Sequence, residues 1–113
     1  MYKIEPNHIP EEAFHPGEYI KDEISFLKIS QRELASKTSI HPTIINEIIK
    51  GKRDITLEYA IKFEKIVGIA AAVLLRLQRK YDKVAGYHKA KQELKRLKIS
   101  PQKQKELLLA MAA

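Results

Sequence analysis

Residues 30–53 read SQRELASKTSIHPTIINEIIKGKR and carry the start and stop signals of two short helices. Ser30 followed by Glu33 forms a capping box, in which each side chain satisfies a backbone N–H at the start of the first helix. Pro42 suits the first turn of the second helix, because its missing N–H would have no partner there. Gly51 is expected to end that helix in the left-handed conformation. The stretch therefore predicts two helices joined by a tight turn.

The second helix is predicted to have one buried and one exposed face. Its buried face consists of isoleucines at i, i+3 and i+4 spacing: Ile45, Ile48 and Ile49. Thr43, Glu47 and Lys50 fall at i, i+4 and i+7 and therefore point outward together. Two helices of this length with a short turn form a helix-turn-helix unit, whose second helix enters the major groove of DNA.

The residues predicted to contact DNA surround this exposed face. They are Gln31, Arg32, His41, Pro42, Thr43, Ile44, Glu47, Lys50, Lys52 and Arg53. The cations at the helix end are placed to neutralise phosphates, and the first helix crosses the DNA backbone. Thr43 is expected to contact a thymine methyl or a phosphate, and Ile44 a thymine methyl. Glu47 is expected either to accept a hydrogen bond from cytosine N4 or to disfavour wrong sequences by repelling their phosphates. His41 either donates to a phosphate or only caps the helix. The competing interpretation of the motif is a helix pair that never touches nucleic acid.

Several segments together resemble a known family. SQRELA (30–35) and HPTIINEIIKGKR (41–53) are similar to the phage-repressor-like helix-turn-helix family of the XRE and Cro/C1 type. HPGE (15–18), ITL (55–57) and LLRLQRKYD (74–82) narrow the resemblance to the HigA-type antitoxins, also called virulence-associated protein I relatives. The similarity spans residues 15–82. This chain departs from the family at Ala71 and Leu74, where a proline and an aromatic residue are usual, and at His41, where a small polar cap is usual.

The resemblance implies a function. A protein of this family would be the DNA-binding antitoxin and transcriptional autorepressor of a type II toxin–antitoxin module. It would bind an inverted-repeat operator in double-stranded DNA as a homodimer and neutralise a toxin protein, a RelE-like mRNA endonuclease. The runner-up is a stand-alone transcriptional regulator of the same helix-turn-helix family without a toxin partner.

A third hypothesis, a nuclease or hydrolase, is disfavoured by the sequence. The four histidines are scattered, with no pair at i, i+3 or i+4 to share a metal ion. The four glycines form no phosphate-binding loop, and no serine has an evident base partner. We therefore expect no enzyme activity, no cofactor and no metal site.

Composition bounds the fold and the compartment. The chain has 113 residues, 44% of them hydrophobic, which suits a single globular domain length. The absence of cysteine fits a reducing cytosol. No apolar run approaches ~20 residues and no basic-then-apolar leader opens the chain, so a cytoplasmic location is expected.

The helical signals predict an all-α fold, which the resemblance makes a five-helix lambda-repressor-like bundle with a long C-terminal helical extension, either continuous or broken. We expect an N-terminal arm at 1–14, the helix-turn-helix domain at 15–82 and a basic helical extension at 83–113. Gly86 weakens the long fifth helix by ~1 kcal/mol relative to alanine, and it is the predicted position of a break or bend.

Apolar residues early in the fifth helix are the predicted dimer interface. They recur at three- and four-residue spacing: Leu74, Leu77, Tyr81 and Val84. A homodimer is expected because palindromic operators match two-fold symmetric proteins. The other interpretation of this stripe is a cover over the monomer's own core.

Charge is divided unevenly along the chain. Residues 1–30 carry a net charge of −3, whereas residues 76–105 contain eleven Lys or Arg against two acidic residues. A toxin that cleaves RNA must bind a polyanion, so an acidic segment of the antitoxin would suit its basic surface. The predicted toxin contacts lie in the N-terminal arm: Ile4, Glu5, Ile9, Glu11, Glu12 and Phe14. The basic region 76–105 is the competing site, for an acidic toxin face or for further DNA phosphates.

Overall fold

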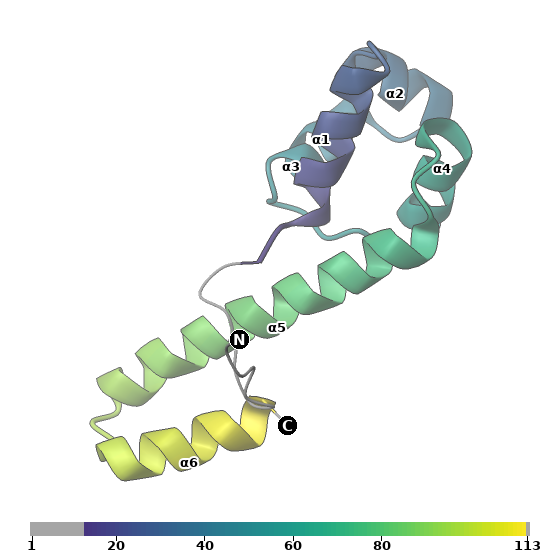
Figure 1. Ribbon diagram of the computed structural model, residues 1–113. Coiled ribbons are helices and arrows are strands. Elements are labelled where there is room, and N and C mark those ends of the chain that lie inside the picture. The colour runs from purple at the N-terminus through teal and green to yellow at the C-terminus, as the bar shows by residue number, and fades with distance from the viewer. Residues whose placement is uncertain (1–12, 113) are drawn as a thin grey trace. The chain divides into compact units, whose positions relative to one another are not determined.

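The computed structural model describes residues 13–112, and all regular structure in this range is helical. The helices are α1 (Pro16–Phe26), α2 (Gln31–Thr38), α3 (Pro42–Ile49), α4 (Leu57–Val67), α5 (Ala71–Arg96) and α6 (Pro101–Ala112) (Figure 1). The predicted all-α class is confirmed, and the described residues form six helices rather than a five-helix bundle with an extension. Two compact units are present, one from Phe14 to Arg79 and one that includes the residues from Lys80 onward.

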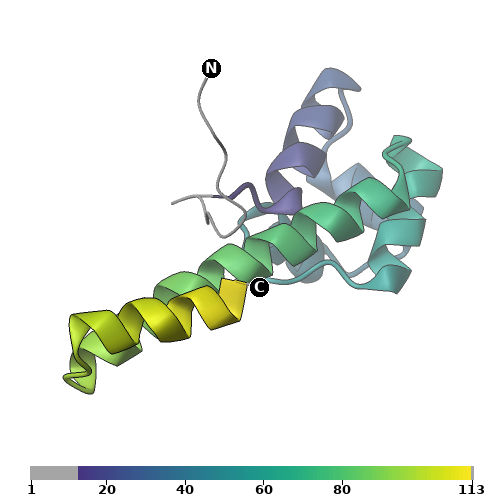
Figure 2. The same ribbon diagram turned by 60° about the horizontal axis from the view of Figure 1, so that its bottom comes forward.

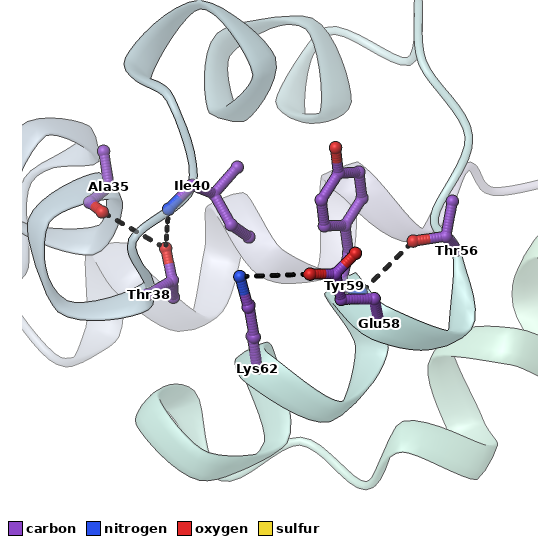
Figure 3. A network of polar contacts seen from close by, with 7 residues as sticks. All are labelled: Ala35, Thr38, Ile40, Thr56, Glu58, Tyr59 and Lys62. Atoms are coloured by element: carbon purple, nitrogen blue, oxygen red, sulfur yellow. Dashed lines mark hydrogen bonds and ion pairs between the residues drawn. The ribbon is translucent and has the colours of Figure 1, made fainter.

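Side-chain caps begin helices of the first unit, among them the predicted cap at Ser30. The Ser30 hydroxyl accepts a hydrogen bond from the Glu33 N–H at 3.0 Å at the start of α2. The Thr56 hydroxyl accepts one from the Tyr59 N–H at 3.2 Å at the start of α4 (Figure 3). Because each cap satisfies an N–H that has no partner within the helix, these residues fix the helix starts.

The core of the first unit forms around α3. This helix packs against both α1 and α2, and α4 packs against α1 and α2 in turn. The largest fully buried apolar side chains come from five helices: Ile20, Leu34, Ile45, Ile48, Phe63 and Leu74. The three isoleucines predicted to share a face of α3 are all buried, which confirms that face. The opposite side of α3 is thereby left toward solvent.

The second unit is a helical hairpin. Gly86 does not break α5, which continues through it to Arg96, so the break predicted there is wrong. The chain turns instead after Leu97, where Lys98 adopts a left-handed φ of 57° and the Ile99 N–H donates to the Leu94 carbonyl. A single glycine costs less than the hydrogen bonds that a helix break would lose, whereas the later turn has its own cap.

The residues after this turn fold back along the second half of α5. Figures 1 and 2 show α6 lying beside that half of α5, and the Gln104 side chain donates to the Ile99 carbonyl at 2.7 Å. Val84 and Leu108 are buried within this unit. The basic extension is therefore a folded helical hairpin with two buried apolar side chains.

Candidate nucleic-acid interface

The turn between α2 and α3 is held by a buried threonine. The Thr38 hydroxyl donates to the Leu34 carbonyl at 2.7 Å. It also accepts from the Ile40 N–H at 3.3 Å, a bond that Figure 3 shows. Ser39 follows in a left-handed conformation with φ of 57°, which turns the chain. One side chain thus satisfies backbone groups on both sides of the turn and fixes how α3 leaves α2.

His41 caps the exposed helix. Its Nδ1 accepts a hydrogen bond from the Thr43 N–H at 3.1 Å, and Pro42 occupies the first helical position. When Nδ1 accepts, a neutral imidazole carries its proton on Nε2. The two roles considered for His41 are therefore compatible, because Nδ1 caps the helix while the exposed ring can offer Nε2–H to a phosphate.

The other end of α3 is closed by Gly51. It has a φ of 75°, its N–H donates to the Ile48 carbonyl, and the Lys52 N–H donates to the Glu47 carbonyl. This pair of bonds is the Schellman ending, which a residue with a Cβ adopts only with strain. The predicted cap is confirmed, and it fixes the backbone of the exposed Lys50 and Lys52.

Glu47 and Arg53 are joined in an ion pair. Arg53 Nε lies 2.6 Å from Glu47 Oε2, with the two side chains 45% and 34% exposed. From the sequence, these two residues were predicted to make separate contacts with DNA, Glu47 with a base and Arg53 with a phosphate. The geometry instead makes Glu47 a partner that orients Arg53. An ion pair this exposed contributes only about 0.5 kcal/mol, so a phosphate can compete for the arginine.

Asn46 is a polar residue of α3 that sequence reasoning missed. Its Nδ2 donates to Gln31 Oε1 at 3.1 Å and so joins α3 to the first residue of α2. The signal was present, because position 46 lies three residues after Thr43 and belongs to the same helical face. The hydrogen bond between Asn46 and Gln31 therefore places two side-chain amides beside the outward-facing residues of α3.

The remaining predicted DNA contacts fall into two groups. Arg32 and Thr43 are exposed, and Arg32 lines a surface hollow together with Ser39 and His41. Ile44 is half-buried and packs against the core, so only part of its side chain is available to a thymine methyl. The predicted DNA contacts therefore all lie within one motif, which consists of α2, α3 and the loop that follows α3.

The predicted dimer stripe is divided in the structure. Leu74 is fully buried in the core of the first unit, so it is not available for a contact between monomers. Val84 is also buried, in the second unit, while Leu77 and Tyr81 are half-buried. The stripe was predicted as one face, but Leu74 and Val84 are buried, and only Leu77 and Tyr81 stay partly exposed.

Of the predicted toxin contacts, only Phe14 falls within the described residues. Its side chain is 74% exposed. It lines a hollow of the first unit with Glu18, Tyr19, Asp22 and Leu77, whose lining is mostly apolar and includes two carboxylates. The other predicted contacts, Ile4, Glu5, Ile9, Glu11 and Glu12, lie outside the described part of the chain.

Within residues 13–112, no group of three or more His, Asp or Glu side chains is arranged to hold a metal ion. In the same range, none of the helices combines the length and the apolar character needed to cross a membrane.

Comparisons with known proteins agree with this geometry. A helix-turn-helix family model matches residues 27–74, which contain α2, α3 and α4. The chain is 34% identical over 77 residues to virulence-associated protein I of Dichelobacter nodosus, a match that covers 67% of this chain and 69% of that protein. It is 33% identical over 63 residues to the uncharacterized HTH-type transcriptional regulator YddM of Escherichia coli K12, covering 56% and 67% respectively.

Solved structures of the same fold cover most of the chain. An addiction module antidote protein of a HigA family from Coxiella burnetii superposes with a TM-score of 0.67 and 30% identity, covering 80% of this chain and 98% of that one. The Pseudomonas aeruginosa antitoxin HigA, solved with the higBA promoter, has a TM-score of 0.67 and 25% identity over the same shares of the two chains. Sequence, fold and these likenesses agree: the chain belongs to the helix-turn-helix family of HigA-type antitoxins and virulence-associated protein I relatives.

Proposed function

We propose that this protein is the antitoxin and autorepressor of a toxin–antitoxin pair, which binds an inverted-repeat operator as a homodimer and neutralises a RelE-like mRNA endonuclease. The observation that carries the DNA-binding part is the exposed side of α3. It presents Thr43 near its start and Lys50, Lys52 and Arg53 at its end, on a backbone fixed by a cap at each terminus. The HigA structure solved with its promoter supports the same use of the motif.

Two substitutions separate base recognition from phosphate binding. Thr43→Ala should change the preferred base at one operator position, because Thr43 is exposed at the start of the helix that enters the groove. Lys52→Ala should weaken binding to all sequences alike and flatten the dependence of affinity on salt. The assay is fluorescence anisotropy with DNA from upstream of the gene and with a library of single-base variants. Equal binding of operator and random DNA by the wild type would refute a sequence-specific regulator.

The hollow beside Phe14 supports a toxin partner with a basic surface. Its mostly apolar lining, together with the carboxylates of Glu18 and Asp22, offers both burial and charge complementarity. We assign the toxin contact to this hollow together with the predicted residues of the arm. The competing site is the basic hairpin, whose described residues 80–112 carry nine Lys or Arg against three carboxylates.

Deletion of residues 1–14 tests this placement when binding to toxin and to operator is measured separately. The toxin to use is the product of an adjacent reading frame of ~100 residues, which is a single-domain length. Loss of toxin binding with retained operator binding would support the arm and the hollow. Unchanged toxin affinity would exclude them, and loss after charge reversal of Lys91 and Lys95 would indicate the hairpin instead.

A stand-alone regulator remains the second candidate function. The likeness to the E. coli transcriptional regulator favours it, because that relative is described only as a regulator. The two functions predict the same operator binding and differ in the neighbouring gene. Co-expression with that gene's product distinguishes them, because an antitoxin relieves the growth arrest that its toxin causes and a stand-alone regulator does not.

A further inference from the structure

Gln78 is a buried polar side chain in the segment LLRLQRKYD, to which the proposed function assigns no role. It lies on α5 within the first unit and is 6% exposed. Its Oε1 accepts a hydrogen bond from the Ile55 N–H at 2.8 Å, and its Nε2 donates to Asp54 Oδ1 at 3.2 Å. A single amide thus uses both its acceptor and its donor on two consecutive residues.

Those two residues belong to the loop that follows the recognition helix α3. The loop runs from Gly51 to Thr56 and contains Lys52 and Arg53. At its start, the Lys52 N–H is bound to the end of α3, and the Arg53 side chain is bound to Glu47. At its far end, Ile55 is buried in the core. Gln78 fixes this far end from α5, directly after the two cations.

We propose that Gln78 is a positioning residue for DNA binding, which holds Lys52 and Arg53 where they can reach phosphates. This inference rests on the proposed function, because it assumes that Lys52 and Arg53 contact DNA. The reason is geometric. Lys52 and Arg53 are exposed, and no side chain of the core holds them directly, so their backbone must be held at both ends to keep their position. A cation on a fixed backbone loses less freedom when it meets a phosphate.

Gln78→Glu tests the inference with little change in side-chain size. The new carboxylate can still accept from the Ile55 N–H, but it faces the Asp54 carboxylate where the amide donated. The loop should therefore shift, and the slope of log affinity against log salt should fall by about 1 to 2 units, since each phosphate contact contributes about 0.9. Adding Asp54→Asn supplies a donor to the new carboxylate and should restore the wild-type slope.

Two controls separate positioning from folding. Thr56→Ala removes the cap of α4 from the same loop but leaves both Gln78 hydrogen bonds in place, so it should lower the melting temperature and keep the slope. In a protein that already carries Lys52→Ala and Arg53→Ala, Gln78→Glu should not change the slope further. A double-mutant cycle measures this loss of additivity. Circular dichroism at the assay temperature gives the folded fraction of each variant.

The outcomes are distinct. A reduced slope for Gln78→Glu, its rescue by Asp54→Asn and its absence in the doubly substituted background would establish the positioning role. A wild-type slope for folded Gln78→Glu, or an equal effect with and without the two cations, would overturn this inference and leave the proposed function standing. Failure of the wild-type protein to bind operator DNA would overturn both.

Discussion

Gly17 sets how closely α1 approaches the end of the recognition helix. A Cβ built at this position would lie 1.8 Å from the Ile48 carbonyl oxygen and 2.7 Å from its carbonyl carbon. These are backbone atoms, so no rotation of a side chain relieves the overlap. The separation would have to grow from 1.8 Å to at least 3.0 Å, the lower limit for real Cβ contacts. Gly17→Ala should therefore force α1 and α3 apart.

The cost of Gly17→Ala follows from this displacement. Overpacking a core usually costs about 1–3 kcal/mol, and the rigid neighbour places this site at the upper end. Alanine regains at most about 1 kcal/mol through its better helix propensity, and less in a first turn. The net loss should be about 2–3 kcal/mol. For a unit of this size that corresponds to a melting temperature lower by about 10–20 °C.

Gly86→Ala is the matched control, because the chemical change is identical and a Cβ there meets no atom of residues 13–112 within 4 Å. It lies inside a continuous helix, so the substitution should stabilise the protein by about 0.5–1 kcal/mol. Thermal unfolding followed by circular dichroism, with a urea titration for the free energy, measures both variants. Equal melting temperatures for the wild type and Gly17→Ala would refute the close approach of α1 to α3.

The other predictions concern DNA and assembly. Joint replacement of Lys50, Lys52 and Arg53 by alanine should lower the affinity for every DNA sequence. It should also reduce the slope of log affinity against log salt by about 2.7 units, because each phosphate contact contributes about 0.9. Lys62→Ala on α4 is the control and should leave this slope unchanged. An unchanged slope for the triple variant would place the phosphate contacts elsewhere. Sedimentation at micromolar concentration should show a dimer that Leu77→Asp shifts toward monomer. A wild-type monomer that still binds its operator would contradict the dimer.

Local sequence determined where the helices begin and end. Ser30 and Thr56 cap the starts of α2 and α4, and Gly51 and Gly68 adopt the positive φ that ends α3 and α4. Ser30 and Thr56 act through a hydrogen bond from a backbone N–H three residues on to their side chain, whereas the glycines act through a positive φ that their missing Cβ permits. They do not depend on how the helices pack, and they were therefore predictable.

The same local rules failed where competing contacts decided the outcome. Leu74 has the spacing of an interface residue, yet it fills the core of the first unit. Gly86 is a residue type that weakens helices, yet α5 continues through it and the turn comes after Leu97. Periodicity indicates which side of a helix is apolar, but it does not say whether a core, a second helix or another molecule covers that side.

The tertiary structure alone decided which distant residues meet. Asn46 reaches Gln31 across 15 residues, and Gln78 reaches Ile55 across 23. Glu47 binds Arg53 because the turn at the end of α3 brings the loop back beside the helix. Hydrogen-bonding groups of these kinds have many possible partners along the chain, and only the packing of the helices selects one. The sequence therefore determined the recognition helix itself, and the packing of its neighbours determined how its polar side chains are held.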